Sequence, residues 1–547
     1  MNLKSFINQS SKKHILCFFS IFLLLSSFVK ADIHDDLGYN LLTESLSNNQ
    51  TFGSSIRVTQ VEAGDNYFPD ISNSEFSSKN FLNLNQTPNF NVSNHATNVG
   101  LIFYGSQTSL SPAVSDIDII GSNDFLSNQL DFVSYPSSNP EVGSSRVVNH
   151  SWVGDYVYLI DEENKLIDTT NMLKHIDWLI ANDDVIHVVG VSNNLNTDVP
   201  LLSSAYNVIS VGKTNATHDY ETSILEDAYF DQRPVIHLVT PENYTSRSTA
   251  YVSSAVSTLI DLGNQNQGWS SGSFINRNGD DVFNSQRVEV MKSLLMAGAS
   301  RLTFNSSNFG QIRDYRSSNY KTDNGLDLRY GAGQLNIYSS YLILSAGEKP
   351  SLEDGGTSNI GFNGFDYDPS FGGSFGSNNT GTYDLGVIPS DGFLQASLSW
   401  NLRVDGPTGS GPFSQFDTNS SLQNLSLTLV DITSGIENEI QISDSMIDNT
   451  QNIRDILQSG NHYQLKVKSL SGTFRIDYGL AWHFKDFTDF DGDGCHDHLD
   501  SDPEDPNITH LTNCSVDVPM LENKALYILI IIMLLLAYSN IHSKRLF

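Results

Sequence analysis

The sequence predicts an α/β domain with a doubly wound, mainly parallel sheet, followed by an all-β sandwich. Over residues 53–347, short apolar strand patterns alternate with amphipathic helix patterns, which is typical of parallel strands joined by helical crossovers. Residues 348–381 are rich in Gly, Ser and Asn and are predicted to be a flexible linker. Residues 382–485 contain short runs with period-two alternation between turn residues, which favours a sandwich.

Length and charge limit the classes of function. At 547 residues the chain is too long for one ordinary core, so we expect several domains. The formal net charge of −32 repels a phosphate backbone and argues against binding nucleic acid.

The first residues resemble a secretory signal peptide. Residues 1–31 contain lysines, an apolar run over 15–29 and a small residue, Ala31, at the expected cleavage point. An N-terminal membrane anchor is the alternative. Residues 32–52 are polar with little periodicity, and we interpret them as a leader into the first domain.

The α/β region is expected to contain at least five strands and three helices. The strand patterns lie at residues 56–61, 115–120, 146–152, 185–191 and 207–212. The helix patterns lie at residues 94–102, 168–182 and 249–262, and residues 66–93 are expected to be a loop.

Three residues occupy positions at which α/β proteins commonly have active-site residues. Glu62 ends a predicted strand beside a Gly turn, at the edge where open sheets bind ligands. His95 begins a predicted helix, and Ser246 precedes another, where the positive end of the helix dipole favours developing negative charge. Taken singly, each has an ordinary interpretation: a solvated acid, a structural histidine and a helix cap.

Together, residues 53–347 resemble the subtilisin-like serine proteases. Val-Glu-Ala-Gly at 61–64 stands where that family has Asp-Thr-Gly, and Asn-His-Ala-Thr-Asn-Val at 94–99 stands for Gly-His-Gly-Thr-His-Val. Thr245-Ser246 matches the Thr-Ser of the nucleophile turn. Further segments in the family's order are 149–152, 188–194, 207–212, 290–297 and 330–336.

The resemblance implies a serine endopeptidase that acts on protein or peptide substrates. Ser246 would be the nucleophile, His95 the general base and Glu62 the acid that orients it, with Asp65 a weaker candidate for that acid. Asn193 would donate its side-chain amide to the oxyanion. By the same resemblance, Ser151 and Trp152 would belong to the substrate-binding edge strand.

Two departures from the family leave a second hypothesis open. Glu62 replaces an aspartate, and Tyr244 replaces the glycine before Thr-Ser, where backbone lies close to substrate. The alternative is an envelope-attached binding or adhesion protein with a catalytically impaired site. The following sandwich resembles the jelly-roll domains found after many such catalytic domains.

Residues 486–515 are predicted to bind structural calcium. Oxygen side chains occupy positions 1, 3, 5, 9 and 12 of the loop 489–500, with Gly494 at position 6, as in calcium loops. The segment resembles thrombospondin type 3 repeats. Zinc through His496 and His498, or an acidic linker without metal, are the alternatives. The predicted ligands are Asp489, Asp491, Asp493, Asp497 and Asp500.

Cysteine usage fits an exported chain. Of three cysteines, Cys17 lies in the predicted signal peptide, which leaves Cys495 and Cys514. In an oxidising compartment this pair is expected to form a disulfide.

The C-terminal residues 516–547 carry a membrane pattern. Residues 525–541 form a short predicted membrane helix, followed by basic residues that would stay cytoplasmic. The segment resembles the C-terminal sorting tails of exported Gram-negative proteins, which implies export and sorting machinery as partners and the cell envelope or exterior as the location. A plain membrane anchor is the alternative.

Overall fold

The computed structural model describes most of the chain between residues 33 and 486. The described ranges are 33–46, 51–85, 91–130, 139–154, 162–195, 202–222, 228–230, 232–301, 320–406 and 419–486. The predicted signal peptide, calcium segment, Cys495, Cys514 and C-terminal tail lie outside these residues. Within them, none of the helices is long and apolar enough to span a bilayer.

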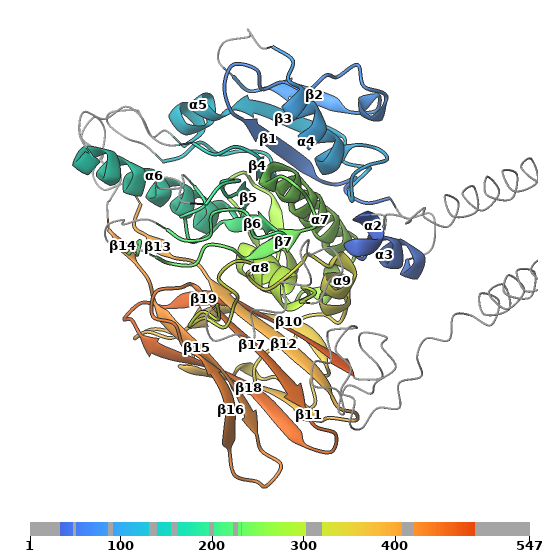
Figure 1. Ribbon diagram of the computed structural model, residues 1–547. Helices are drawn as coiled ribbons and strands as arrows, with labels where there is room; N and C mark the ends of the chain where they lie inside the picture. Colours follow the sequence, from blue (N-terminus) through green and yellow to red (C-terminus); the bar gives the residue numbers. More distant parts are fainter. Residues whose placement is uncertain are drawn as a thin grey trace, which may run out of the picture.

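The first half of the structure is built on a seven-stranded parallel sheet, which confirms the predicted fold class (Figure 1). The strand order is β2-β3-β1-β4-β5-β6-β7, and every neighbouring pair is parallel. The bounds are β1 Arg57–Glu62, β2 Asn80–Asn83, β3 Asp116–Gly121, β4 Val147–His150, β5 Ile186–Gly190, β6 Ile209–Lys213 and β7 Leu238–Thr240.

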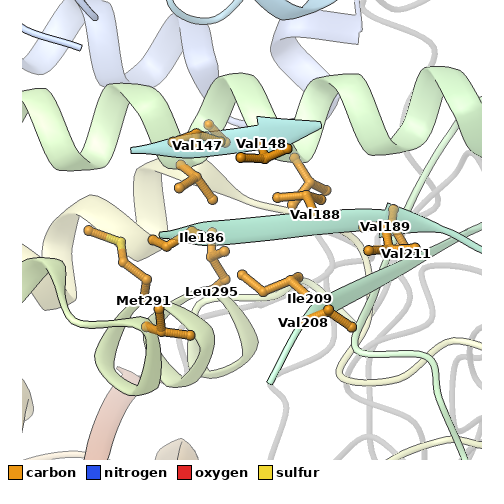
Figure 2. Close-up of a cluster of buried hydrophobic side chains, with 14 of the residues drawn as sticks. Val147, Val148, Ile186, Val188, Val189, Val208, Ile209, Val211, Met291 and Leu295 are labelled. Carbon is orange, nitrogen blue, oxygen red and sulfur yellow. The ribbon is translucent and has the colours of Figure 1, made fainter. Parts of the chain in front are cut away.

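The central strands are apolar because both of their faces are covered. β4, β5 and β6 are buried throughout. Figure 2 shows their valines and isoleucines with Met291 and Leu295, which come from α8 (Val288–Ala297). This dense centre fixes the carboxyl ends of the strands, where the candidate site lies.

Five helices of nine or more residues accompany the sheet among the described residues. They are α4 Asn94–Tyr104, α6 Glu162–Asp183, α7 Thr245–Gln265, α8 and α9 Ile337–Ser345. Shorter helical segments are α2 Ile33–Asp36, α3 Tyr39–Ser45, α5 Ser122–Asp124, η1 Ser74–Phe76, η2 Phe125–Gln129, η3 Gln267–Trp269, η4 Asn284–Gln286 and η6 Leu352–Asp354.

Helix α7 runs through the interior because its side chains are small. Its residues 248–263 are buried without exception, and serines, threonines and alanines dominate them. Small side chains allow α4 and the strands β4–β6 to approach closely. The buried hydroxyls find local acceptors, as Thr249 Oγ1 donates to the Thr245 carbonyl at 2.8 Å.

The second half is the predicted all-β sandwich. One sheet has the order β10-β19-β12-β17 and the other β11-β18-β15-β16, with antiparallel pairing throughout. The bounds are β10 Asn363–Phe371, β11 Thr380–Val387, β12 Gly392–Trp400, β15 Asn424–Asp431, β16 Asn438–Ser443, β17 Thr450–Leu457, β18 His462–Ser471 and β19 Ile476–Asp486. Two short hairpins are β8 Ser273–Ile275 with β9 Asp281–Phe283, and β13 Arg403–Val404 with β14 Ser420–Ser421.

The predicted flexible linker at 348–381 is wrong. β10 (Asn363–Phe371) lies inside this segment, and β11 begins at Thr380. The prediction relied on the Gly, Ser and Asn content and overlooked three aromatic residues in the same segment. Phe365, Tyr367 and Phe371 are all buried. These side chains supply the core contacts that a linker lacks.

Two further expectations from composition need correction. Residues 33–45 of the predicted polar leader form α2 and α3, and Leu37 and Leu42 are fully buried in the α/β core. The Ile337 backbone N–H donates to the Leu37 carbonyl at 2.9 Å, which ties the segment to α9. In the predicted loop 66–93, β2 pairs with β3 as an edge strand of the sheet.

The two halves share a continuous interface. Figure 1 shows α8 between the parallel sheet and the sandwich, where it contacts β12 and β19. Asn207 and Leu402 exchange two hydrogen bonds across the boundary, of 2.8 Å and 3.2 Å. Phe365 and Ala481 of the sandwich belong to the same apolar cluster as the α/β core.

Candidate active site

The candidate site lies where the strand order of the sheet reverses. The chain proceeds from β1 to β3 on one side and then to β4 on the other, so the crevice at the carboxyl ends of β1 and β4 is the expected ligand site. A pocket of ≈ 320 Å³ opens there. The described residues that line it are Glu62, Ala63, Asn66, Ser93, His95, Ser151, Trp152, Val153, Gly190, Asn193, Thr245 and Ser246.

Glu62 and His95 contact each other in the wall of this pocket. Glu62 is the last residue of β1 and is buried, whereas half of the His95 side-chain surface is exposed. His95 Nδ1 lies 2.7 Å from Glu62 Oε2. Ser93 caps α4 by accepting from the His95 and Ala96 backbone N–H groups, which fixes the position of the histidine on the first turn.

A chain of buried hydrogen bonds fixes the position of the Glu62 carboxylate. Gln60 Nε2 donates to Glu62 Oε1 at 2.8 Å and to the Ala96 carbonyl at 2.9 Å. The hydroxyl of Tyr104 in turn donates to Gln60 Oε1 at 2.6 Å. Both carboxylate oxygens therefore have a partner, and β1 is linked to α4.

The sequence interpretation did not identify Gln60 or Tyr104. The available indication was spacing: Gln60 is a polar residue two positions before Glu62 in a buried strand, so the two side chains share a face.

The contact between Glu62 and His95 and the burial of Glu62 shift the pKa of both groups. The hydrogen bond that His95 donates to Glu62 raises the pKa of His95 above its ordinary value of 6.5. Burial raises the pKa of Glu62, and the hydrogen bonds from His95 and Gln60 oppose that rise. A buried carboxylate beside a histidine in a pocket is the kind of perturbed pair found at functional sites.

Ser246 is the second residue of α7 and lines the same pocket. The helix begins at Thr245, whose hydroxyl donates to the Val191 carbonyl at 2.7 Å and so attaches the turn to the end of β5. The backbone N–H of Ser246 belongs to the first turn, where N–H groups have no acceptor within the helix. The site therefore offers a hydroxyl and a backbone donor at one position.

Asn193 follows β5 and faces this turn. The backbone N–H of Thr245 donates to Asn193 Oδ1 at 2.9 Å. Because that oxygen is occupied as an acceptor, Asn193 presents its Nδ2 donors to the remaining surroundings, which include the pocket.

Ser151 and Trp152 continue from β4 along the pocket wall. Ser151 Oγ donates to the Ser246 carbonyl at 2.8 Å and accepts from Asn149 Nδ2 at 2.8 Å. Trp152 is 8% exposed and donates its indole N–H to His150 Nδ1 at 3.2 Å. All six sequence-predicted site residues of the α/β domain therefore line one pocket.

Tyr244 does not occupy the pocket wall formed by the described residues. It caps α7 with φ −131° and ψ 137°, an ordinary extended conformation that needs no glycine. Tyr244 is 60% exposed. Asp65, the weaker candidate for the acid, is likewise absent from the described lining, where Glu62 is present.

The predicted calcium ligands cannot be placed because they lie outside the described residues. Across the described ranges, no group of three or more His, Cys, Asp or Glu side chains has the geometry to hold a metal ion.

Comparisons with known proteins give structural likenesses only. No protein-family model matches the chain, and no curated protein matches it. The self-cleaved protease domain of PatA is 17% identical with a TM-score of 0.32, covering 55% of this chain and 99% of that one. A cold adapted subtilisin-like serine proteinase is 13% identical with a TM-score of 0.24, covering 41% and 85%.

A third solved structure resembles a smaller share of the chain. The pre-peptidase C-terminal domain of collagenase from Bacillus anthracis is 18% identical with a TM-score of 0.16, covering 23% of this chain and 92% of that domain. Scores this low decide neither family nor activity. The solved structures that resemble this chain thus include subtilisin-like proteases, at low similarity.

Proposed function

We propose that this protein is a serine endopeptidase that hydrolyses peptide bonds through Ser246, His95 and Glu62. The observation that carries the proposal is the 2.7 Å contact between His95 Nδ1 and buried Glu62, beside Ser246 in one pocket. A nucleophile, a base and a group that orients the base are the minimum for this chemistry.

In the proposed reaction, Ser246 Oγ attacks the carbonyl carbon of the scissile bond while its proton passes to His95 Nε2. Glu62 accepts the hydrogen bond from His95 Nδ1–H and stabilises the imidazolium that forms. The carbonyl oxygen becomes negative and receives hydrogen bonds from Asn193 Nδ2 and the Ser246 backbone N–H. Such a donor contributes about 3–4 kcal/mol to transition-state stabilisation.

The tetrahedral intermediate then collapses. The C–N bond breaks, and His95 Nε2 returns its proton to the departing amine, leaving an ester on Ser246. Water attacks this ester by the reverse proton transfers and releases the carboxylic acid. Each step uses groups that line the pocket.

A fluorophosphonate probe tests the proposal, because it reacts covalently only with an activated serine. We expect labelling of the wild-type protein, loss of labelling in Ser246→Ala, and unchanged labelling in Ser434→Ala, a control at an exposed turn of the sandwich. Absence of wild-type labelling, or equal labelling of Ser246→Ala, would contradict the enzyme and favour a binding or adhesion protein on this scaffold.

We further propose, from the sequence alone, that the chain is exported to the cell envelope or beyond, and that its tail engages sorting machinery or a membrane. The predicted calcium loop would stabilise the segment after the sandwich. Mass spectrometry of the N-terminus of the expressed protein tests the first point: we expect the mature chain to begin at Asp32, and retention of residues 1–31 would oppose it.

A further inference from the structure

A second pocket lies between the two halves of the structure and shares no described lining residue with the pocket beside Ser246. Its volume is ≈ 50 Å³. One wall is formed by residues 298–301, which follow α8, together with Asn336 and Ser339 at the start of α9. The other wall is formed by residues of the sandwich strands β12, β17 and β19. A ligand in this pocket would therefore contact both the α/β domain and the sandwich.

The sandwich residues of this pocket project from one face of their sheet. Gln395 of β12 lies directly opposite Arg454 of β17 and, on its other side, opposite His483 of β19. Phe393, two residues before Gln395, lies opposite Lys485. Residues that are opposite each other in antiparallel strands, or two apart along a strand, share a face. The side chains of these five residues therefore lie together.

This face is turned toward the α/β domain and the pocket. Gln395 Nε2 donates to the carbonyls of Ala297 at 2.9 Å and Ala299 at 3.0 Å, at the end of α8. Arg454 Nε donates to Gln395 Oε1 at 3.2 Å, and its guanidinium carbon lies 4.0 Å from the centroid of the Phe393 ring. Because Gln395 and Phe393 also line the pocket, the charged end of Arg454 is held at the pocket wall.

The described lining of this pocket is positively charged. It includes Arg301, Arg454 and Lys485 and no Asp or Glu. Asp455 and Asp486 follow Arg454 and Lys485 along β17 and β19, so they project from the other face of the sheet. Cationic groups gathered at one cavity repel one another, and an anion between them replaces repulsion with attraction. In a chain of net charge −32, this local excess of positive charge favours an anion site.

His483 shows that the positive field reaches the interior of the pocket wall. The residue is 7% exposed, and its Nδ1 lies 2.7 Å from Asn363 Oδ1. Burial and, after it, the charge of Lys485 lower the pKa of His483 to about 4. The ring is therefore neutral at physiological pH, and the charge of the site comes from the arginines and the lysine.

The opposite wall adds a hydroxyl donor and the start of a helix. Ser300 Oγ accepts a hydrogen bond from Asn336 Nδ2 at 3.0 Å, which leaves the Ser300 O–H able to donate to a ligand. Asn336 is also the N-cap of α9, whose nine residues begin at Ile337. The positive end of the α9 dipole thus lies at the same wall and favours an anion there.

We propose that this pocket binds one tetrahedral oxyanion, inorganic phosphate or sulfate, between the α/β domain and the sandwich. Two guanidinium groups and one ammonium group suit a dianion, and guanidinium forks match the geometry of its oxygens. At about 10–15 Å³ for each water-sized group, ≈ 50 Å³ holds about four oxygens. That volume leaves no room for the organic part of an ester, so the ligand is the free ion.

The bound ion would stabilise the interface between the two halves, because Arg301 belongs to the α/β domain and Arg454 and Lys485 belong to the sandwich. This role does not depend on the proposed peptidase activity. Its test therefore measures binding and melting temperature and needs no substrate.

Isothermal titration of the full chain with sodium phosphate and with sodium sulfate tests the proposal. We expect one ion per chain in the wild type. Arg454→Gln should weaken binding at least tenfold, since it removes a charged donor at the pocket wall. Arg475→Gln, at an exposed position outside the described lining, is the matched control and should bind within twofold of the wild type.

Thermal unfolding provides the second measurement. Sulfate stabilises many proteins by exclusion from their surface, so the informative quantity is the difference between variants at one ionic strength. Sulfate should raise the melting temperature of the wild type and of Arg475→Gln more than that of Arg454→Gln, because only the first two retain the site.

Several results would overturn the proposal. They are the absence of saturable binding of both ions to the wild type, and equal affinity in Arg454→Gln and the wild type. Phenyl phosphate bound as tightly as inorganic phosphate would overturn the free ion as the ligand, and acetate bound as tightly would assign the pocket to a carboxylate instead. If circular dichroism shows that Arg454→Gln does not fold, Lys485→Gln, at an exposed position near the end of β19, replaces it with an expected loss of at least threefold.

Discussion

The backbone N–H of Thr245 donates to Oδ1 of Asn193 at 2.9 Å and thereby determines which end of that amide is free to donate. The same bond connects the end of β5 with the first turn of α7. The proposed oxyanion donor and the proposed nucleophile are thus fixed relative to each other before any substrate binds.

Asn193→Ala is expected to lower kcat by about 10²–10³, with KM nearly unchanged, because it removes a donor that acts on charge formed in the transition state. Steady-state kinetics with one peptide substrate measures both values. Asn194→Ala, at the exposed neighbouring position, is the control and should retain wild-type kinetics. A mainly KM effect in Asn193→Ala would assign Asn193 to ground-state binding instead.

Glu62→Gln is expected to lower kcat by about 10⁴ and to move the acid limb of the pH profile to lower pH. His95 must be neutral to act as a base, so activity falls as pH drops through its pKa. Glu62 is the main cause that raises this pKa, and its loss lowers it. A profile of kcat/KM between pH 5 and 9 measures the limb, with Glu44→Gln on α3 as a control. An unmoved limb would separate Glu62 from the titrating base.

Tyr244→Gly is expected to change kcat/KM less than threefold, although it restores the glycine of the family that the sequence resembles. The observed φ of −131° needs no glycine, and Tyr244 is 60% exposed and not part of the described pocket lining. A rise of tenfold or more in kcat/KM would mean that the ring obstructs substrate and would support the impaired-enzyme hypothesis.

The α/β domain and the sandwich are expected to unfold in a single calorimetric transition. The reciprocal hydrogen bonds between Asn207 and Leu402 and the shared apolar cluster make the interface part of the core. Asn207→Ala should lower the free energy of unfolding by about 1–3 kcal/mol, since it leaves buried groups of Leu402 unpaired. Asn438→Ala, at an exposed strand position, is the control. Two resolved transitions would contradict the shared core.

Chelation tests the predicted calcium loop. With EGTA we expect the melting temperature to fall, because a ligand that binds only the folded state stabilises it. Asp493→Asn should lower the melting temperature in calcium and make it insensitive to EGTA, whereas Asp405→Asn in the sandwich should behave as the wild type. A transition that EGTA leaves unchanged would argue against structural calcium at 489–500.

The predictions from sequence succeeded where periodicity is local. The strands at 56–61 and 207–212 and the helices at 94–102 and 249–262 form as expected, within a few residues of their predicted ends. The sequence predictions failed where they relied on amino-acid composition instead of a periodic pattern of apolar residues. The Gly- and Asn-rich segment at 348–381 contains the buried strand β10, because Phe365 and Tyr367 pack with the α/β core and Phe371 packs inside the sandwich.

The sequence by itself determined the fold class and the identities of the candidate residues, since period-two and helical patterns and short motifs are written along the chain. Only the tertiary structure decided that Glu62 reaches His95 and that Gln60 and Tyr104 support Glu62. These contacts join residues up to 44 positions apart, and they depend on which strands are neighbours and which way each side chain faces. A single sequence does not encode that information locally, because sheet order and register arise from packing the whole domain.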